Sequence, residues 1–160
     1  MKRTDTSAWP CTIARATTVF GDHWNVLLLR EAFYGVRRFE DFQRSLGIGR
    51  GILTERLSGL VHDGLLVKVE YQDKPVRHEY RLTGKGRDAF PVLMSMAVWA
   101  DRHMVGPEGT PVIFEHKTCG YDLHIEVACS HCGDPVDLRE TGVRWGPGHP
   151  SHRQDDDRQA

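Results

Sequence analysis

The 160-residue sequence has no long apolar run, almost no net charge and only four cysteines. No stretch approaches the roughly 18 consecutive apolar residues of a membrane-spanning helix, so we expect no membrane partner. The first residues carry two positive charges with no apolar stretch after them, which argues against a secretory signal. We therefore expect a cytoplasmic protein, in which cysteines are more often metal ligands or redox sensors than structural disulfides.

The formal net charge of −1 does not by itself indicate a nucleic-acid-binding protein. The distribution of charge is more informative, because twelve Lys and Arg stand against eight Asp and Glu between Arg30 and Arg87. The acidic run Gln154–Asp157 masks this local excess in the total. An excess of this size gives weak support for a polyanionic partner. The length suits one domain with a small appendage.

Residues 39–64 have the pattern of two short helices joined by a tight turn. Phe39, Phe42 and Leu46 are spaced as the apolar stripe of an amphipathic helix. The glycines that follow suit a sharp turn, because glycine tolerates a positive φ. From Leu53 a second apolar stripe repeats at i, i+4, i+7 and i+8, and Gly64 is a natural left-handed stop for this second helix.

Two segments rich in β-forming residues follow the second helix. The sequence predicts strands over residues 65–71 and 77–82, with a turn at 72–75. This hairpin has the place of the wing in a winged helix-turn-helix, whose second helix enters the DNA major groove, about 12 Å wide. An ordinary solvated face is the alternative interpretation of that helix, and the flanking elements favour DNA.

Helical spacing separates the buried stripe of the second helix from an outward face. Residues of that face or of the N-terminal tip are the predicted base-reading set: Arg50, Thr54, Glu55 and Ser58. Gly51 lies on the same face and is also predicted to bind DNA. Cations before the first helix or on the wing are the predicted phosphate-binding set: Arg37, Arg38, Lys74 and Arg77. Arg56 lies on the flank, where either a phosphate or a protein carboxylate could hold it.

The flanking segments predict three further helices. Two span residues 13–20 and 24–33, with Asp22 as the cap of the second. A long helix is expected from Thr83 to about His103, with a kink or a late start because Pro91 lacks a backbone donor. This helix is apolar on two faces, so we expect one face to pack on its own domain and the other on a second subunit.

Several short motifs together resemble the HxlR-type transcriptional regulators, which are relatives of the MarR winged-helix group. The resemblance covers roughly residues 11 to 103, and it rests on these segments: Cys11–Ala16, Gly21–Trp24, Arg37–Phe39, Leu53–Leu57, Gly64–Leu66, His78–Thr83 and Gly86–Arg87. It implies a homodimer with paired terminal helices that binds an inverted-repeat operator. In some members a cysteine near the position of Cys11 senses oxidants or electrophiles, although a packed small hydrophobe is the alternative interpretation of this residue.

The C-terminal part contains two short x-x-C-G turns at ribbon-like spacing. His116 and Cys119 belong to the first turn, and Cys129 and Cys132 to the second. Two such turns can supply the four ligands of a closed tetrahedral Zn²⁺ site, as in a zinc ribbon. His124 or His131 could replace His116, the segment could be a metal-free β-hairpin, or its cysteines could be redox-active.

The predicted fold class is therefore mainly α with a small β-wing, plus a small C-terminal β module. The expected parts are an N-terminal arm (1–10), a winged helix-turn-helix domain (11–105), a zinc-ribbon-like module (112–140) and a disordered tail (141–160). The predicted function is a sequence-specific DNA-binding regulator, a homodimeric repressor with a small-molecule or redox effector, and not an enzyme. The alternatives are a protein-interaction adaptor and a thiol-redox protein using the CxxC, which lacks the βαβ surroundings of a thioredoxin-like site.

Overall fold

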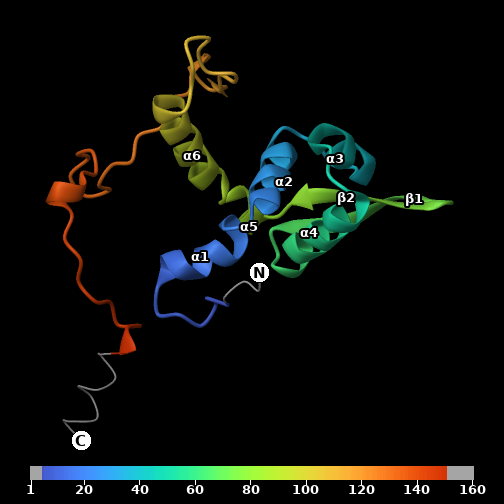
Figure 1. Cartoon of the computed structure of the whole chain (residues 1–160), viewed down its shortest axis with the longest axis horizontal. Helices are drawn as coiled ribbons and strands as arrows, with labels where there is room; N and C mark the ends of the chain where they lie inside the picture. The colour runs from blue at the N-terminus through green and yellow to red at the C-terminus, as the bar shows by residue number, and fades with distance from the viewer. Residues whose placement is uncertain (1–4, 151–160) are drawn as a thin grey trace, which may run out of the picture. The chain divides into compact units, whose positions relative to one another are not determined.

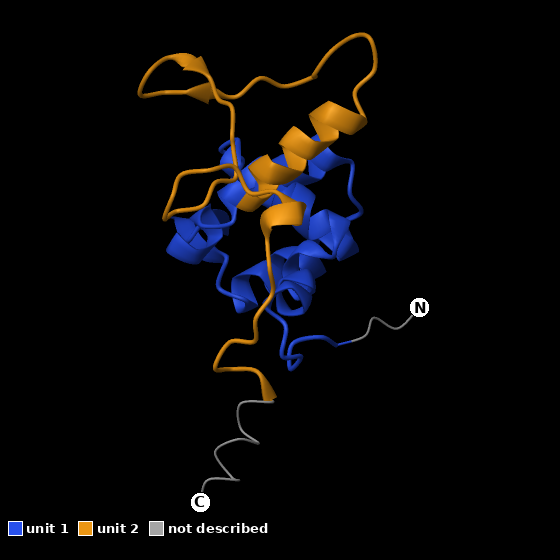
Figure 2. Cartoon of the chain, turned by 90° about the vertical axis from the view of Figure 1, so that its left-hand side faces the viewer, with its two compact units in different colours: residues 1–91 blue, residues 92–160 orange. Residues whose placement is uncertain are grey.

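The structure, a computed structural model, describes residues 5–150. It divides into two compact units, residues 1–91 and 92–160, coloured blue and orange in Figure 2. The division falls inside α6 (Phe90–His103), whereas the sequence placed this helix wholly with the winged helix-turn-helix. Among the described residues, no helix is long and apolar enough to cross a membrane.

The first unit opens with α1 (Thr12–Phe20) and α2 (His23–Phe33), which Figure 1 shows as separate helices. They separate at Gly21–Asp22, as predicted, because Asp22 caps α2. Its Oδ1 accepts the backbone N–H of Trp24 at 3.0 Å, which satisfies an otherwise unpaired donor of the first turn. Leu28 and Leu29 of α2 are fully buried, which confirms this helix as central to the core.

The helix-turn-helix consists of α3 (Phe39–Leu46) and α4 (Arg50–His62). The turn depends on Gly47, whose φ of 60° lies in the left-handed region that other residues avoid. The apolar stripes predicted from spacing face one another, and their central members are buried: Phe42, Leu53, Leu57 and Leu60.

A buried carboxylate ties α2 to α3. Glu31 is only 5% exposed. Ser45 of α3 donates a hydrogen bond to one of its oxygens, and the Arg30 guanidinium lies 2.6 Å from the other. Such partners are required because an unpaired buried charge is strongly destabilising. The contact fixes the C-terminal end of α3 on the core.

The wing is an antiparallel hairpin of β1 (Leu66–Asp73) and β2 (Val76–Leu82). Its strands run further toward the turn than predicted, so the connection is only Lys74–Pro75. Strand β2 also joins the segment before α3, because the Tyr80 N–H donates to the Arg37 carbonyl at 2.8 Å. The wing is thereby attached to the base of the helix-turn-helix.

The single long helix predicted from Thr83 is wrong, although the late start expected from Pro91 is confirmed. Thr83 caps only the short α5 (Gly84–Arg87), by accepting the Gly86 N–H at 3.0 Å. The next helix, α6, begins at Phe90 and places Pro91 in its first turn, where a missing N–H breaks no helical bond.

The second unit contains, after α6, the two-residue strands β3 (Glu115–His116) and β4 (Tyr121–Asp122) and the 3-10 turn η1 (Leu138–Glu140). The segment 121–127 between the two cysteine turns is strand-like in sequence, but it forms a strand only at Tyr121–Asp122, and the backbone from residue 123 to 127 has no regular structure. No helix or strand lies within 141–149. The rest of the predicted tail, with its acidic run, and the first four residues of the predicted arm lie outside the described residues.

Candidate nucleic-acid interface

Helix α4 presents the outward face that its spacing predicts. One side of the helix is buried and the opposite side is exposed. Every residue of α4 that is predicted to bind DNA is exposed: Arg50, Gly51, Thr54, Glu55 and Ser58. The hydroxyl of Thr54 donates to the Arg50 carbonyl at 2.9 Å, which leaves its methyl group and remaining lone pair for a base edge.

Arg50 stands at the N-terminal tip of α4 and is held by an aromatic ring. Its guanidinium carbon lies 5.1 Å from the ring centre of Phe39, the first residue of α3. A cation–π contact of this kind restricts the side chain without using any of its five donors. Arg50 therefore keeps its whole hydrogen-bonding fork for a ligand.

The wing brings further cations to Arg50. A shallow crevice of about 200 Å³ is lined by Arg50 together with Lys68 and Arg77 of the hairpin. Tyr80 closes one side of the crevice; burial first, and then the Glu40 charge, raise the pKa of its hydroxyl, which stays protonated and able to donate. Lys68 was missed by the sequence prediction. The signal was available in the sequence, because Lys68 is an exposed residue of β1, the strand that leads into the wing turn.

Arg38 is held by the wing in the same manner. Its guanidinium carbon lies 4.9 Å from the ring centre of Tyr71 on β1. Arg37 and Arg38 both line a broad, open hollow on the surface of the first unit. Tyr71, like Phe39, is a positioning residue that the sequence prediction did not identify.

The predicted phosphate-binding cations differ in their partners from several other arginines of the first unit. Arg30, Arg44, Arg56 and Arg81 each form an ion pair with a carboxylate. Within the part of the chain that the structure describes, none is formed by the following exposed cations: Arg37, Arg38, Arg50, Lys74 and Arg77. Cations without an ion pair can neutralise phosphates without first losing an internal carboxylate partner.

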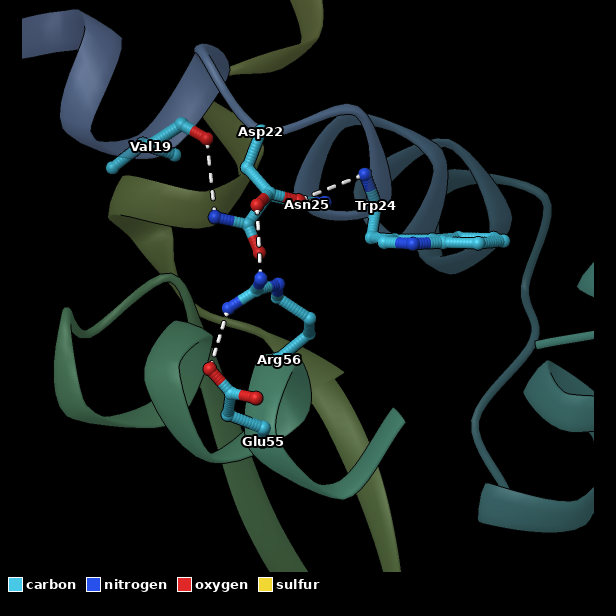
Figure 3. Close-up of polar contacts among 6 residues, drawn as sticks. All are labelled: Val19, Asp22, Trp24, Asn25, Glu55 and Arg56. Carbon is cyan, nitrogen blue, oxygen red and sulfur yellow. Dashed lines mark hydrogen bonds and ion pairs between the residues drawn. The ribbon is translucent and has the colours of Figure 1, made fainter. Parts of the chain in front are cut away.

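The position of Arg56 allowed either a phosphate or a protein carboxylate as its partner, and the structure shows carboxylates. Its guanidinium lies 3.2 Å from Asp22 and 2.8 Å from Glu55 (Figure 3). Asp22 also caps α2, and Asn25 beside it donates to the Val19 carbonyl at 3.1 Å. This cluster joins the N-terminal end of α2 to α4, and it thereby fixes the position of α4.

The cysteines and histidine predicted as zinc ligands lie in two separate pairs. His116 and Cys119 share the turn between β3 and β4, with Nδ1 and Sγ 3.2 Å apart. Cys129 and Cys132 share the second turn, where the backbone N–H groups of Cys132 and His131 hold the pKa of the Cys129 thiol below its usual value. Within residues 5–150, no three His, Cys, Asp or Glu side chains form a group that could hold one metal ion.

Cys11 is exposed and precedes α1, where its sulfur accepts the Ala14 N–H at 3.5 Å. The alternative interpretation of this residue as a packed hydrophobe is therefore wrong within a single chain. Its position at the start of a helix leaves the thiol open to solvent.

Comparison with known proteins decides the family. The family model described as HxlR-like helix-turn-helix matches residues 19–107, which span α2 to the end of α6. This chain belongs to the HxlR-like helix-turn-helix family. It is a family of transcriptional regulators and not of enzymes, as the sequence predicted, so the thiol-redox enzyme is excluded.

Two relatives extend the likeness beyond the family model. The uncharacterized HTH-type transcriptional regulator Rv3095 of Mycobacterium tuberculosis is 43% identical over 137 residues, which cover 86% of this chain and 87% of the relative. The crystal structure of PA1607, a putative transcription factor, is 34% identical with a TM-score of 0.80, over 88% of this chain and 99% of that one. Such coverage reaches into the second unit.

A second similar structure is that of the redox regulator HypR in its reduced form. It is 29% identical with a TM-score of 0.54, over 57% of this chain and 92% of its own. This likeness covers a smaller share of the chain than the likeness to PA1607.

Proposed function

We propose that this HxlR-family regulator is a homodimeric repressor that recognises an inverted-repeat operator in the cytoplasm through α4. The observation that carries the proposal is the set of exposed, unpaired cations around the recognition helix. Arg50 lies at the tip of α4, and cations of the wing lie beside it across one crevice. A groove-bound helix flanked by phosphate-binding cations is the arrangement of winged-helix DNA-binding proteins.

We assign discrimination between DNA sequences to α4, and overall DNA affinity to the cations around it. Arg50 offers a bidentate fork to guanine, while Thr54 and Ser58 offer hydroxyls on the same exposed face. The residues Arg37, Arg38, Lys74 and Arg77 neutralise phosphates. With four phosphate contacts per chain, a dimer makes eight, and the logarithm of the binding constant should fall with log salt with a slope of roughly −7.

The dimer is supported by apolar surface on the terminal helices. On α6, Val92, Met96 and Trp99 recur at helical spacing and are 42%, 46% and 60% exposed. On α1 no residue is buried, and Ile13 is 77% exposed. Uncovered apolar stripes of this kind mark protein interfaces. A two-fold dimer places its recognition helices on half-sites about one DNA turn, 34–36 Å, apart.

Binding to the DNA upstream of the protein's own gene, measured by footprinting and gel shift, tests the proposal. Arg50→Ala should lose discrimination by roughly 1–3 kcal/mol between operator and random DNA, as expected for a lost bidentate guanine contact. Lys74→Ala should weaken binding to both DNAs and reduce the salt slope by about two per dimer.

Arg44→Ala is the matched control, because Arg44 is exposed but already paired with Asp41 at 3.1 Å. It should leave both affinities close to those of the wild type. A wild-type protein that gives no sequence-specific shift would instead support the protein-interaction adaptor. Equal losses on operator and random DNA for Arg50→Ala would remove its base-reading role. Raised reporter transcription on deletion of the gene distinguishes a repressor from an activator.

HypR, a relative named as a redox regulator, suggests a redox effector for this chain as well. Cys11 is exposed at the start of α1, one of the two helices assigned to the dimer interface. We assign the sensing role to this thiol, because oxidation there would alter the pairing of the subunits.

A further inference from the structure

The two cysteine-containing turns of the second unit have the same backbone construction. In the first, the Gly120 N–H donates to the His116 carbonyl at 2.8 Å; in the second, the Gly133 N–H donates to the Cys129 carbonyl at 2.8 Å. Each glycine follows its cysteine directly and has a positive φ, 74° and 82°. Only a glycine closes such a turn without strain. Two segments of different sequence therefore adopt one local structure.

In the first turn the two potential ligands lie side by side. His116 Nδ1 and Cys119 Sγ are 3.2 Å apart. Two ligands on a tetrahedral zinc ion, one nitrogen at about 2.05 Å and one sulfur at about 2.3 Å, would be about 3.5 Å apart. The first pair is thus within a few tenths of an ångström of the separation that the metal requires.

The second turn carries its two cysteines three residues apart, the same spacing that His116 and Cys119 have in the first turn. The thiolate is the form of cysteine that binds zinc. All three cysteines of the two turns are exposed, so an ion can reach them.

We propose that His116, Cys119, Cys129 and Cys132 form one closed, structural Zn²⁺ site within a single chain. The two turns are preformed halves, and the ion joins them. Only eight residues, 121–128, connect them, so once one half has bound, the other is present at high effective concentration. The linker lacks helix or strand after Asp122 apart from the bridge between Ala128 and Pro135, so its central residues can rearrange when the halves meet. Metal binding is then coupled to folding of this segment.

The choice of His116 over the two other histidines follows from their positions. His116 already lies beside a cysteine sulfur in its own turn. His124 lines the hollow between α6 and the linker, among apolar side chains. His131 lies between the two cysteines of the second turn, which already supplies two ligands.

Titration of the full chain with Co²⁺ and then Zn²⁺, under reducing conditions, tests the site. Thiolate-to-cobalt charge-transfer bands and tetrahedral d–d bands should saturate at one Co²⁺ per chain and disappear with one Zn²⁺. Cys119→Ser, Cys132→Ser and His116→Ala should each weaken Zn²⁺ binding on the order of a hundredfold or more. Cys11→Ser, outside both turns, and His124→Ala are matched controls that should bind as the wild type does.

Amide hydrogen exchange provides a separate test of whether metal binding folds this segment. Zn²⁺ should protect residues 114–138 and leave the exchange of α2 to α4 unchanged. Binding that survives both Cys119→Ser and His116→Ala would overturn the four-ligand site, as would one ion per two chains or no binding. Operator binding of the Cys119→Ser variant is independent of this outcome, because no residue of the two turns belongs to the DNA-binding set.

Discussion

Removal of the Asp22 carboxylate should destabilise the helix-turn-helix through two separable contacts. One is the cap of α2, in which Oδ1 accepts the Trp24 N–H at 3.0 Å. The other is the ion pair at 3.2 Å with Arg56, in which the two side chains are only 10% and 29% exposed. Arg56 Nε is buried without a hydrogen-bond partner in the described chain, so its guanidinium depends on the contacts it has.

The magnitudes follow from these two contacts. Loss of an N-cap side chain costs about 0.5–2 kcal/mol. Loss of a hydrogen bond to a charged group costs roughly 1.5–3 kcal/mol, and the partial exposure of Arg56 places this case at the lower end. Asp22→Ala should therefore lower the free energy of unfolding by about 2–4 kcal/mol. Asp22→Asn keeps a good capping residue and removes only the charge, so it should cost about 1–2 kcal/mol.

Urea denaturation of the full chain, followed by circular dichroism, measures both values. Asp41→Ala is the control, because Asp41 is paired with Arg44 at 3.1 Å but both side chains are well exposed; its cost should stay below about 1 kcal/mol. A double-mutant cycle of Asp22→Asn with Arg56→Met should give a coupling energy of about 1 kcal/mol.

The reasoning fails if Asp22→Asn is as stable as the wild type within about 0.5 kcal/mol and the cycle shows no coupling. The capping contribution is refuted if Asp22→Asn and Asp22→Ala are equally destabilised, because the cap would then contribute nothing.

Three further predictions concern other parts of the chain. Gly86→Ala should cost about 1–3 kcal/mol or more in urea denaturation, because an added Cβ would lie 2.1 Å from the Leu65 carbonyl oxygen; Gly84→Ala, with no atom within 4 Å of the added Cβ, is its control and should be nearly neutral. Trp99→Glu should shift the protein from dimer to monomer in light scattering at micromolar concentration, since it puts a charge into the exposed stripe of α6, and an unchanged dimer would place the interface elsewhere. Treatment with a thiol oxidant should change operator affinity in the wild type and not in Cys11→Ser, and an equal response of both would exclude Cys11 as the sensor.

Much of the first unit was predictable because its signals are local. The helix-turn-helix follows from apolar residues at helical spacing on either side of Gly47. The cap of α2 follows from Asp22 at the right distance before an apolar run, and the wing from two β-rich segments around a proline turn. Each of these depends on residues within a few positions of one another, where backbone geometry determines what meets.

Other features depended on which distant residues meet. The partner of Arg56 required α2 and α4 to pack, and periodicity alone left a phosphate and a carboxylate equally open. The meeting of Arg50 with Lys68 and Arg77 required the wing to fold back toward α4. The need for glycine at position 86 follows from its close approach to Leu65, a contact across 21 positions of the chain.

By itself, the sequence determined the order of the helices, the turn between α3 and α4, the outward face of α4 and the two cysteine turns, because hydrogen bonding and side-chain spacing within one element settle these. Only the tertiary structure decided which cations stay unpaired, which aromatic rings hold Arg38 and Arg50, and that the two cysteine turns stand apart. These features are set by packing between elements, because residues distant in the sequence interact only when the folded backbone brings them together.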